Sequence, residues 1–462
     1  MTRLVVKLGS SSIASGDGLA LDVIADLVTQ IAAAQRAGHQ VILVTSGAAR
    51  LGRRLPELES VLRRYSAVRR DGAARRDSPI GVALAASVGQ PALMALYRQL
   101  AAAVGMEVCQ VLLSRSDLDS AQAMGDVGTV LVSALEAGLL PVVNGNDTTD
   151  PKSELDNDQI AVAVAVATEA SRLTFLTNVS GVYADEQMRD RIARLTPEEA
   201  RAVRSSSAGE GRGGMRSKLN AAARAAYCGV ECAIGSARDA DVVARSLRPR
   251  ARMGTVIRAA AGQLAPTQRW VGGIAYPMGS IGINREAERS LRAGSTLFLS
   301  GVKRIDGDFD PGAVVELVDV RHPERLIGRG SVAMPSTVLR LLRALSPDDV
   351  ANVISILLRL RHGGDPGTGP LDDQRFADIA DLTRRSSQAA KQARAELESA
   401  TPERVRALTD ALLASQPRAC AAMLAAGLFK NGEVAARQQV RDMHAVHRDS
   451  LVVFGAEAVT PC

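Results

Sequence analysis

Two lysines, far apart in the sequence, stand next to loops of small residues. Lys7 ends the apolar run Leu4–Val6 and precedes the loop "GSSS". Lys218 follows the glycine-rich stretch "GEGRGG" and begins an alanine-rich helical pattern. A lysine at the end of a buried strand needs an anionic partner, and small loop residues let backbone N–H groups approach that anion closely. We therefore expect a phosphate-bearing ligand, although the spacing is not the GxxxxGK[ST] pattern.

Acidic, amide and hydroxyl residues complete this polar set. They are Ser46, Asn144, Asp147, Asn157 and Asp158, and none of the five histidines falls among them. The absence of a histidine argues against acyl transfer by a Ser-His-Asp triad. Two lysines and glycine-rich loops suit in-line phosphoryl transfer, which needs neutralised charge and no protein nucleophile. We expect the aspartate at 158 to hold both ammonium groups in position.

The elements that would position these side chains alternate between apolar strands and Ala/Leu-rich helices, over roughly the first 260 residues. Most strand candidates are continuous apolar runs, which is typical of strands buried on both faces of a mainly parallel sheet. Helical patterns such as 21–36 and 90–103 lie between them and predict an α/β sandwich. The predicted strands are 4–7, 41–44, 108–113, 140–143, 173–176 and 230–234.

Small or polar residues follow nearly every predicted strand. Examples are Ser46-Gly47, Asn144–Asp147 and Thr177-Asn178. The carboxyl ends of parallel strands share one crevice, where ligands of such sheets bind. The run Asp156–Asp158 precedes an Ala/Val helix, and a helix cap alone would need only one of these residues. The pattern therefore predicts a site for a small polar ligand at this edge of the sheet.

Six ordered motifs carry a resemblance to a known family. The sequence is similar to the glutamate 5-kinases of the amino acid kinase family across essentially the first 260 residues. The resemblance implies ATP-dependent phosphorylation of the γ-carboxylate of L-glutamate, the first step of proline biosynthesis, with Mg²⁺ bound through the nucleotide phosphates. The motifs are "VVKLGSSS", "VILVTSGAA", "VVNGND", "LDNDQIAVAVA", "FLTNVSGVY" and "GRGGMRSKLNAA".

The resemblance also implies roles for individual residues. Lys7 and Lys218 would contact the transferring phosphoryl group, and Asp158 would organise them. Substrate would be bound by Ser46, Gly47, Asn144, Asp147 and Asn157. The nucleotide would be bound by Lys7, Gly9, Ser10, Ser11, Thr177, Asn178, Arg212, Gly213, Gly214, Met215 and Lys218. No side chain is expected to bind a metal ion directly.

Three positions depart from the family pattern. Gly145 stands where the family has glutamate, Asn178 where it has aspartate, and Leu155 where it has glycine. The first and third leave open an amino acid kinase fold that acts on a different amino acid or carboxylate. A third reading is a degenerate kinase whose second domain binds RNA. The retained lysine pair and Asp158 argue against degeneracy.

The sequence pattern changes from Thr267 onward. Short strands alternate with Gly/Pro/Asp turns, and this part resembles a PUA domain, a small β-barrel-like module. We expect it over residues 267–348, completed by a final strand within 444–456. Residues 349–440 have helical patterns with Ser/Thr-Pro caps and read as an insertion in that domain. One stretch of this insertion faintly resembles glutamate-5-semialdehyde dehydrogenase, which suggests coupling to that enzyme or self-association.

Bulk properties fit these expectations. A chain of 462 residues predicts two or three domains, and 46% hydrophobic with 23% charged residues is typical of a globular protein. The net charge of +6 is spread along the chain, so we expect no nucleic-acid partner. No apolar run is expected to reach membrane-spanning length, and five scattered cysteines suit a reduced cytoplasm. The family resemblance suggests a homo-oligomer.

Overall fold

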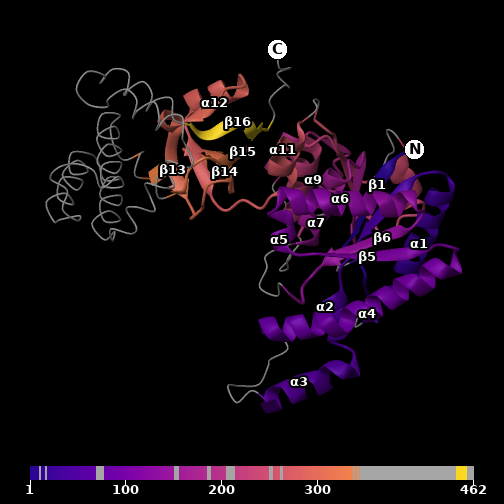
Figure 1. The fold of residues 1–462 in the computed structure, drawn as a ribbon. Helices are drawn as coiled ribbons and strands as arrows, with labels where there is room; N and C mark the ends of the chain where they lie inside the picture. The colour runs from indigo at the N-terminus through magenta and orange to yellow at the C-terminus, as the bar shows by residue number, and fades with distance from the viewer. Residues whose placement is uncertain are drawn as a thin grey trace, which may run out of the picture. The chain divides into compact units, whose positions relative to one another are not determined.

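A computed structural model of the chain describes most of its first 340 residues and one late segment. The chain divides into two compact units, Met1–Tyr276 and Pro277–Cys462. Each unit has its own sheet (Figure 1). The described residues are 1–9, 12–15, 18–68, 78–149, 156–184, 189–203, 214–248, 253–260, 264–336, 339–340, 343 and 444–454.

The first unit is built on an eight-stranded sheet in the order β5-β6-β4-β1-β7-β9-β10-β8. The first six of these strands run parallel, and β10 runs antiparallel to β9. All six predicted strands are present within this parallel part. The strands are β1 (Arg3–Leu8), β4 (Gln40–Val44), β5 (Val108–Leu113), β6 (Leu140–Gly145), β7 (Arg172–Thr177), β8 (Arg194–Leu195), β9 (Glu231–Ser236) and β10 (Thr255–Ile257).

Helices cover both faces of this sheet, so the predicted α/β/α sandwich with a mainly parallel sheet is confirmed (Figure 1). One layer contains α1 (Leu21–Arg36), α4 (Pro79–Ala103) and α10 (Val242–Leu247). The other contains α6 (Ala121–Glu136), α7 (Asn157–Ala167) and α9 (Met215–Tyr227). The short elements are β2 (Ala14–Ser15), β3 (Gly18–Leu19), α2 (Ala48–Gly52), α3 (Pro56–Val68), α5 (Arg115–Leu118), α8 (Pro197–Ala202), α11 (Pro266–Arg269) and the π-helix η1 (Trp270–Ile274).

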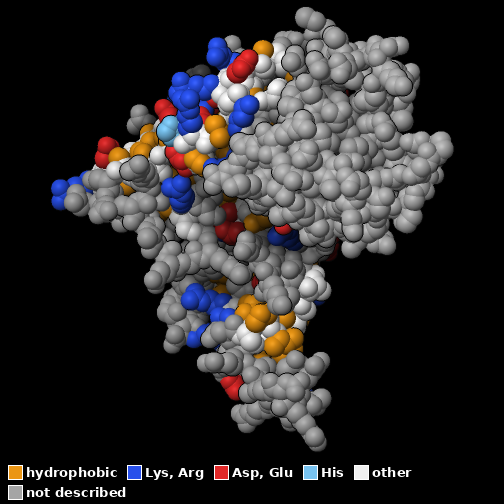
Figure 2. All heavy atoms as spheres, turned by 90° about the vertical axis from the view of Figure 1, so that its left-hand side faces the viewer, with side chains coloured by type: hydrophobic (Ala, Val, Ile, Leu, Met, Phe, Trp, Pro, Cys, Tyr) orange, Lys and Arg blue, Asp and Glu red, His pale blue; other side chains and the backbone are white. Residues whose placement is uncertain are grey.

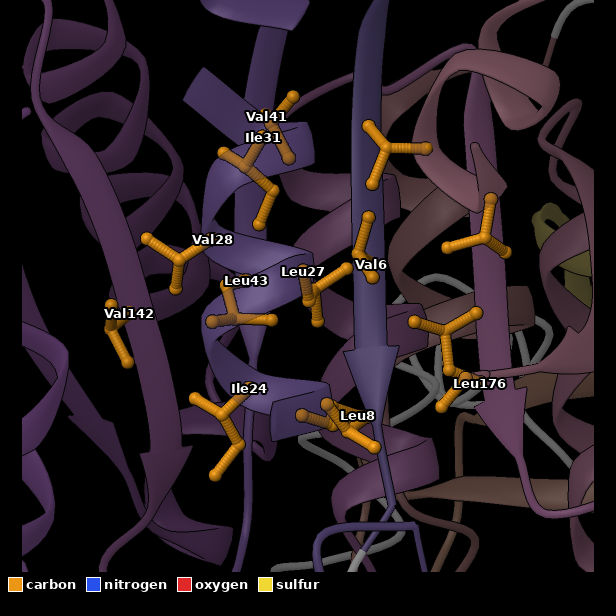
Figure 3. Packing of buried hydrophobic residues seen from close by; sticks show 14 of the residues in the cluster. Val6, Leu8, Ile24, Leu27, Val28, Ile31, Val41, Leu43, Val142 and Leu176 are labelled. Atoms are coloured by element: carbon orange, nitrogen blue, oxygen red, sulfur yellow. The ribbon is translucent and has the colours of Figure 1, made fainter. Parts of the chain in front are cut away.

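Aliphatic side chains fill the space between α1 and the sheet. Figure 3 shows Ile24, Leu27 and Ile31 of α1 facing Val6 and Leu43 of the strands. Their spacing of three and four positions places them on one face of the helix. Burial of this apolar area contributes most to the favourable free energy of folding, and it holds α1 against the strands.

Helix α4 is longer and more apolar than the sequence analysis expected. It begins at Pro79 and runs through Pro91, and it is long and apolar enough to cross a membrane by length and composition alone. The expectation that no apolar run reaches that length is therefore wrong. Half of the most apolar stretch of α4 is buried inside the protein, because the helix packs on α2 and on the core of the first unit.

The crossing of α2 and α4 depends on two glycines. A Cβ on Gly89 would overlap the carbonyl oxygen of Ala48 and lie 2.5 Å from the amide nitrogen of Gly52. A Cβ on Gly52 would overlap the carbonyl oxygen of Ala85. The two backbones therefore touch directly, and α4 holds in place the helix that follows the end of β4.

The segment that joins the two units packs on the first one. Residues 267–276 were assigned to the second domain from the sequence, but Val271 and Gly273 are buried and Gly273 lies against Val166 of α7. The indole of Trp270 donates a hydrogen bond to the carbonyl of Leu118 at 3.2 Å. Apolar burial and this bond explain why the segment belongs with the first unit.

The second unit is the predicted small β domain, a curled six-stranded sheet in the order β12-β16-β15-β14-β11-β13 (Figure 1). Its neighbours are antiparallel except for β11 and β14, which are parallel. Its elements are β11 (Ser280–Ile283), α12 (Arg285–Arg292), β12 (Leu297–Phe298), the 3₁₀-helix η2 (Leu299–Gly301), β13 (Val302–Asp306), β14 (Val314–Asp319), β15 (Leu326–Val332) and β16 (His444–Val453).

Strand β16 comes from the end of the chain and lies inside this sheet. It pairs antiparallel with β15 on one side and with β12 on the other. Ala445 and Val446 are fully buried there. The return of this late segment to the sheet is what the sequence analysis expected. The helical insertion predicted over 349–440 lies outside the described residues and stays a prediction.

Arginine and carboxylate side chains form a cluster within the second unit. Arg325 contacts Glu288 at 2.5 Å and Asp319 at 3.0 Å, and Arg292 also binds Glu288 at 3.0 Å. The hydrogen bonds from Arg325 and Arg292 lower the pKa of Glu288 below its usual value. Over the described part of the face in Figure 2, Lys and Arg side chains lie beside Asp and Glu side chains.

Replacement of Gly89 by alanine should destabilise the first unit. Because the new methyl group would overlap α2 backbone, we expect Gly89→Ala to lower the free energy of unfolding by about 1–3 kcal/mol. Gly125→Ala on α6 is the control, since a Cβ there meets no atom within 4 Å and helix propensity favours alanine. Urea unfolding followed by circular dichroism measures both. Equal stability of the two variants would show that the helices can separate without cost.

Glu288 should make the stability of the protein sensitive to acid. A carboxylate whose pKa is lowered by folding stabilises the protein above its unfolded pKa, and that contribution disappears as the pH falls through the folded pKa. We expect Glu288→Gln to be less stable than the parent at pH 7, with the difference closing below about pH 4. The exposed Glu286→Gln on the same helix is the control. A difference that stays constant between pH 7 and pH 3 contradicts this linkage.

Candidate active site

One carboxylate lies between the two lysines that the sequence analysis singled out. Lys7 Nζ is 2.6 Å from Asp158 Oδ1, and Lys218 Nζ is 3.3 Å from Asp158 Oδ2. Lys7 is on β1, Asp158 is in the first turn of α7, and Lys218 is in the first turn of α9. Residues from three distant parts of the chain therefore form one ionic cluster.

All three charged side chains of this cluster are buried. Asp158 is fully buried, Lys7 is 3% exposed and Lys218 is 5% exposed. Buried charges are costly unless they are paired, and both lysines are paired with the same carboxylate. Two ammonium groups facing one carboxylate leave an excess of positive charge. The cluster is thus suited to attract a further anion.

The order of the strands places the other polar residues on two sides of β1. The strands β4 and β6 lie on one side, and their ends carry Ser46, Gly47 and Asp147. The strands β7 and β9 lie on the other side, where Thr177 ends β7. Because all these strands are parallel, their carboxyl ends meet at one edge. Lys7 lies between the two groups.

Several buried polar atoms on the β4–β6 side have no hydrogen-bond partner among the described residues. They include the hydroxyl of Ser46, the Oδ1 of Asn157 and the Nε2 of Gln90. Buried polar groups are nearly always satisfied, so unsatisfied ones gathered at a site point to a polar ligand. Gly47, with φ of 101°, turns the chain after Ser46 and is the N-cap of α2, which begins at Ala48.

Gly145 lies beside two polar side chains of the same side. A Cβ at this position would lie 3.5 Å from Asn157 Oδ1 and 3.7 Å from Asp147 Oδ1. Asp147 itself is exposed. The structure therefore brings these three residues together, as the sequence analysis expected, and a glycine leaves room between the two polar side chains.

The side chain of Asn144 has its hydrogen bonds within the protein. Its Nδ2 donates to Gln90 Oε1 at 2.9 Å, and its Oδ1 accepts from the amide of Gly145 at 2.9 Å. Tyr97, also on α4, is 2.7 Å from the hydroxyl of Thr45, and burial raises its pKa to about 12. Both contacts anchor strand ends to α4. Sequence reasoning missed Gln90, whose only signal is a polar residue within an apolar helix.

Asp156 joins the first turns of α7 and α9. Its Oδ1 caps α7 by accepting from the amide of Asp158 at 3.2 Å. Its Oδ2 accepts from the hydroxyl of Ser217 at 3.0 Å. Ser217 directly precedes Lys218, so this bond fixes the distance between the two charged partners. The three residues of the run Asp156–Asp158 therefore serve three different purposes.

The β7 side presents a loop end and a helix N-terminus. The hydroxyl of Thr177 donates to Asn178 Oδ1 at 3.1 Å, and Asn178 is exposed. Gly214 is the N-cap of α9 and Met215 is its first residue, and no side chain caps this N-terminus. Uncapped amides at a helix N-terminus are donors for an anion.

The loop after β1 is described only in part. The amide of Gly9 donates to the carbonyl of Leu176 at 3.4 Å, so it is directed toward β7 within the protein. Ser10, Ser11, Arg212 and Gly213 lie outside the described residues, and their expected contacts with nucleotide stay predictions. Among the residues that the structure describes, no group of three or more His, Cys, Asp or Glu side chains could hold a metal ion.

Comparison with known proteins agrees with this geometry. Residues 2–236 match the amino acid kinase family, and residues 279–354 match the PUA domain. The PUA match falls on the curled second sheet, so the predicted kinase and PUA architecture is confirmed.

Relatives of known annotation extend this match over both units. The chain is 34% identical to a glutamate 5-kinase of Gloeobacter violaceus over 77% of its length and 95% of that enzyme. It is 34% identical to a glutamate 5-kinase of Thermus thermophilus over 72% of its length and 87% of that enzyme. A third, from Thermotoga maritima, is 31% identical over 73% and 90%. This chain therefore belongs to the amino acid kinase family and, within it, to the glutamate 5-kinases.

Proposed function

We propose that this protein transfers the γ-phosphoryl group of ATP to the γ-carboxylate of L-glutamate, forming L-glutamyl 5-phosphate for proline biosynthesis. The observation that carries the proposal is the buried carboxylate of Asp158 between Lys7 and Lys218. Relatives over both units are glutamate 5-kinases, which supports glutamate over the alternative acceptors. The intact lysine pair argues against a degenerate kinase.

The lysine pair supplies the charge that phosphoryl transfer requires. Charge on the three outer oxygens of the transferred group must be neutralised as the bond to the leaving group weakens. Lys7 and Lys218 are already positioned by Asp158, so they need not be reorganised when the reaction occurs. Asp158 acts through the lysines as a positioning residue, and the attacking nucleophile is the carboxylate of the substrate.

The acceptor would bind on the β4–β6 side of Lys7. The unsatisfied atoms of Ser46 and Asn157, with Asp147 nearby, offer a hydroxyl, an amide and a carboxylate for the polar ends of an amino acid. Gly47 would let the chain turn closely around it. Asn144 would hold this loop through its bonds to Gln90 and Gly145 rather than contact the substrate.

ATP with its Mg²⁺ would bind as a second substrate on the β7 side. Thr177 and Asn178 follow β7, and the uncapped first turn of α9 from Gly214 and Met215 offers backbone donors to phosphate. The Mg²⁺ would be carried by the phosphates, since the described residues form no metal cage of their own. The loop residues Ser10, Ser11, Arg212 and Gly213 complete this proposed nucleotide site.

The proposal also covers the protein's partners. Family membership favours a homo-oligomer in the cytoplasm. The helical patterns of residues 349–440 favour a surface for self-association or for the enzyme that reduces glutamyl phosphate.

Trapping of the acyl phosphate tests the proposed activity. With ATP, Mg²⁺, L-glutamate and hydroxylamine, we expect the protein to form γ-glutamyl hydroxamate. Lys218→Ala should lower the rate at least about a hundredfold, because one of two charges on the transferring group is lost. Lys303→Ala, an exposed lysine of the second unit, should keep full activity.

Each negative outcome of this assay has its own meaning. If hydroxamate forms from another acid but not from glutamate, that acid is the phosphoryl acceptor and glutamate is not. No turnover with any acid supports the degenerate reading. Undiminished activity of Lys218→Ala overturns the mechanism whatever the substrate.

The hydrogen bond between Ser217 and Asp156 should matter for the rate. Ser217→Ala removes the tie that fixes Lys218 relative to α7, so we expect kcat to fall about five- to tenfold with the KM for glutamate nearly unchanged. Ser217→Thr retains the hydroxyl and should keep most of the activity. If both variants had parental kcat, Lys218 would be positioned by its ion pair alone.

A further inference from the structure

A second cavity lies at the opposite ends of the strands that carry the candidate active site. It has a volume of about 330 Å³ and is bordered by β7, β8, β9, β10 and α10. Arg172 and Glu231, the first residues of β7 and β9, line it. Thr177, at the other end of β7, belongs to the nucleotide side of the active site. The cavity is therefore separate from the kinase site.

Arginines dominate the charged lining of this cavity. Arg172, Arg194, Arg245 and Arg258 line it together with a single carboxylate, Glu231, and Arg245 is 3.9 Å from Asp239 outside the lining. Glu231 is already paired with Arg172 at 3.1 Å. The side chains of Arg194 and Arg258 are exposed, and neither has a hydrogen bond or ion pair with any residue that the structure describes. The cavity therefore has an excess of positive charge that this part of the protein does not neutralise.

The floor of the cavity adds a polar group without a partner. Thr174 lies two residues after Arg172 on the same face of β7 and is 2% exposed. Its hydroxyl forms no hydrogen bond with the described residues and is accessible from the cavity. Ala233, Met253 and Val256 form an apolar surface beside it. A cavity that combines an accessible hydroxyl, two exposed guanidinium groups and an apolar wall has the mixed lining of a small-molecule site.

We propose that this cavity binds a small phosphate-bearing organic molecule. Arg194 and Arg258 pair with the phosphate, since guanidinium groups match phosphate oxygens in charge and in planar geometry. The hydroxyl of Thr174 contacts the bound molecule on the cavity floor, and its organic part rests on Ala233 and Val256. The volume is within the range of small-molecule sites. The site does not depend on the kinase activity.

Calorimetric titration of the full chain with phenyl phosphate tests this proposal. The experiment is run at constant ionic strength with the parent and with Lys218→Ala. Phenyl phosphate that binds at the lysine pair of the kinase site would no longer bind to Lys218→Ala. We expect saturable binding in both. We also expect weaker binding of inorganic phosphate, which lacks the apolar part, and of benzoate, which carries a carboxylate instead.

Two pairs of arginine substitutions, one inside the cavity and one outside it, test where phenyl phosphate binds. Arg194→Gln with Arg258→Gln should raise the Kd at least about tenfold, because two charged hydrogen-bond donors are lost. Arg98→Gln with Arg289→Gln removes the same charge from exposed positions elsewhere and should change the Kd less than about twofold. Thr174→Val should weaken binding severalfold, whereas Thr174→Ser should not.

Three results would overturn the proposal. One is no saturable binding of phenyl phosphate to the parent. Another is an equal effect of the two arginine pairs, which would mean nonspecific attraction to positive charge. The third is loss of binding in Lys218→Ala alone, which would place the ligand in the kinase site.

Discussion

A single buried carboxylate sets the geometry on which the rest of the first unit depends. Asp158 is the shared partner of two buried lysines, whose ammonium groups are costly to desolvate without paired charge. The ends of β1, α7 and α9 must therefore converge within hydrogen-bond distance. The parallel sheet supplies β1 and its neighbours at one edge, and Asp156 connects the two helices. The fold holds the end of β1 close to the first turns of α7 and α9.

The arrangement also separates the two substrates. The strand with Lys7 lies in the middle, with the acceptor residues on β4 and β6 to one side and the nucleotide residues on β7 and α9 to the other. Before substrates bind, the acceptor side holds buried polar atoms without partners. These atoms are costly in the free protein and become satisfied only by a polar ligand. The free protein therefore holds hydrogen-bonding groups in place that only a bound ligand can satisfy.

Much of this organisation could be predicted from the sequence. Continuous apolar runs identified the strands, and the need of a strand-end lysine for an anion identified Lys7 and, with family resemblance, Lys218 and Asp158. The bond from Ser217 to Asp156 and the contact of Gln90 with Asn144 could not be predicted, because they join residues that only tertiary folding brings together. The sequence pattern predicts only 90–103 of α4, whereas the helix continues through Pro91 back to Pro79. The packing of 267–276 was missed because short-range pattern does not reveal which unit buries Val271.

The position of β16 has a consequence for how the chain is made. All strands of the first sheet come from residues up to Ile257 and the unit ends at Tyr276, so this unit can finish folding while the remainder is still being synthesised. The second sheet cannot, because β16 lies between β12 and β15 and only residues 444–453 can fill that place. Until translation reaches them, the facing edges of β12 and β15 have no strand to pair with. The second domain is therefore completed only after residues 444–453 have been synthesised.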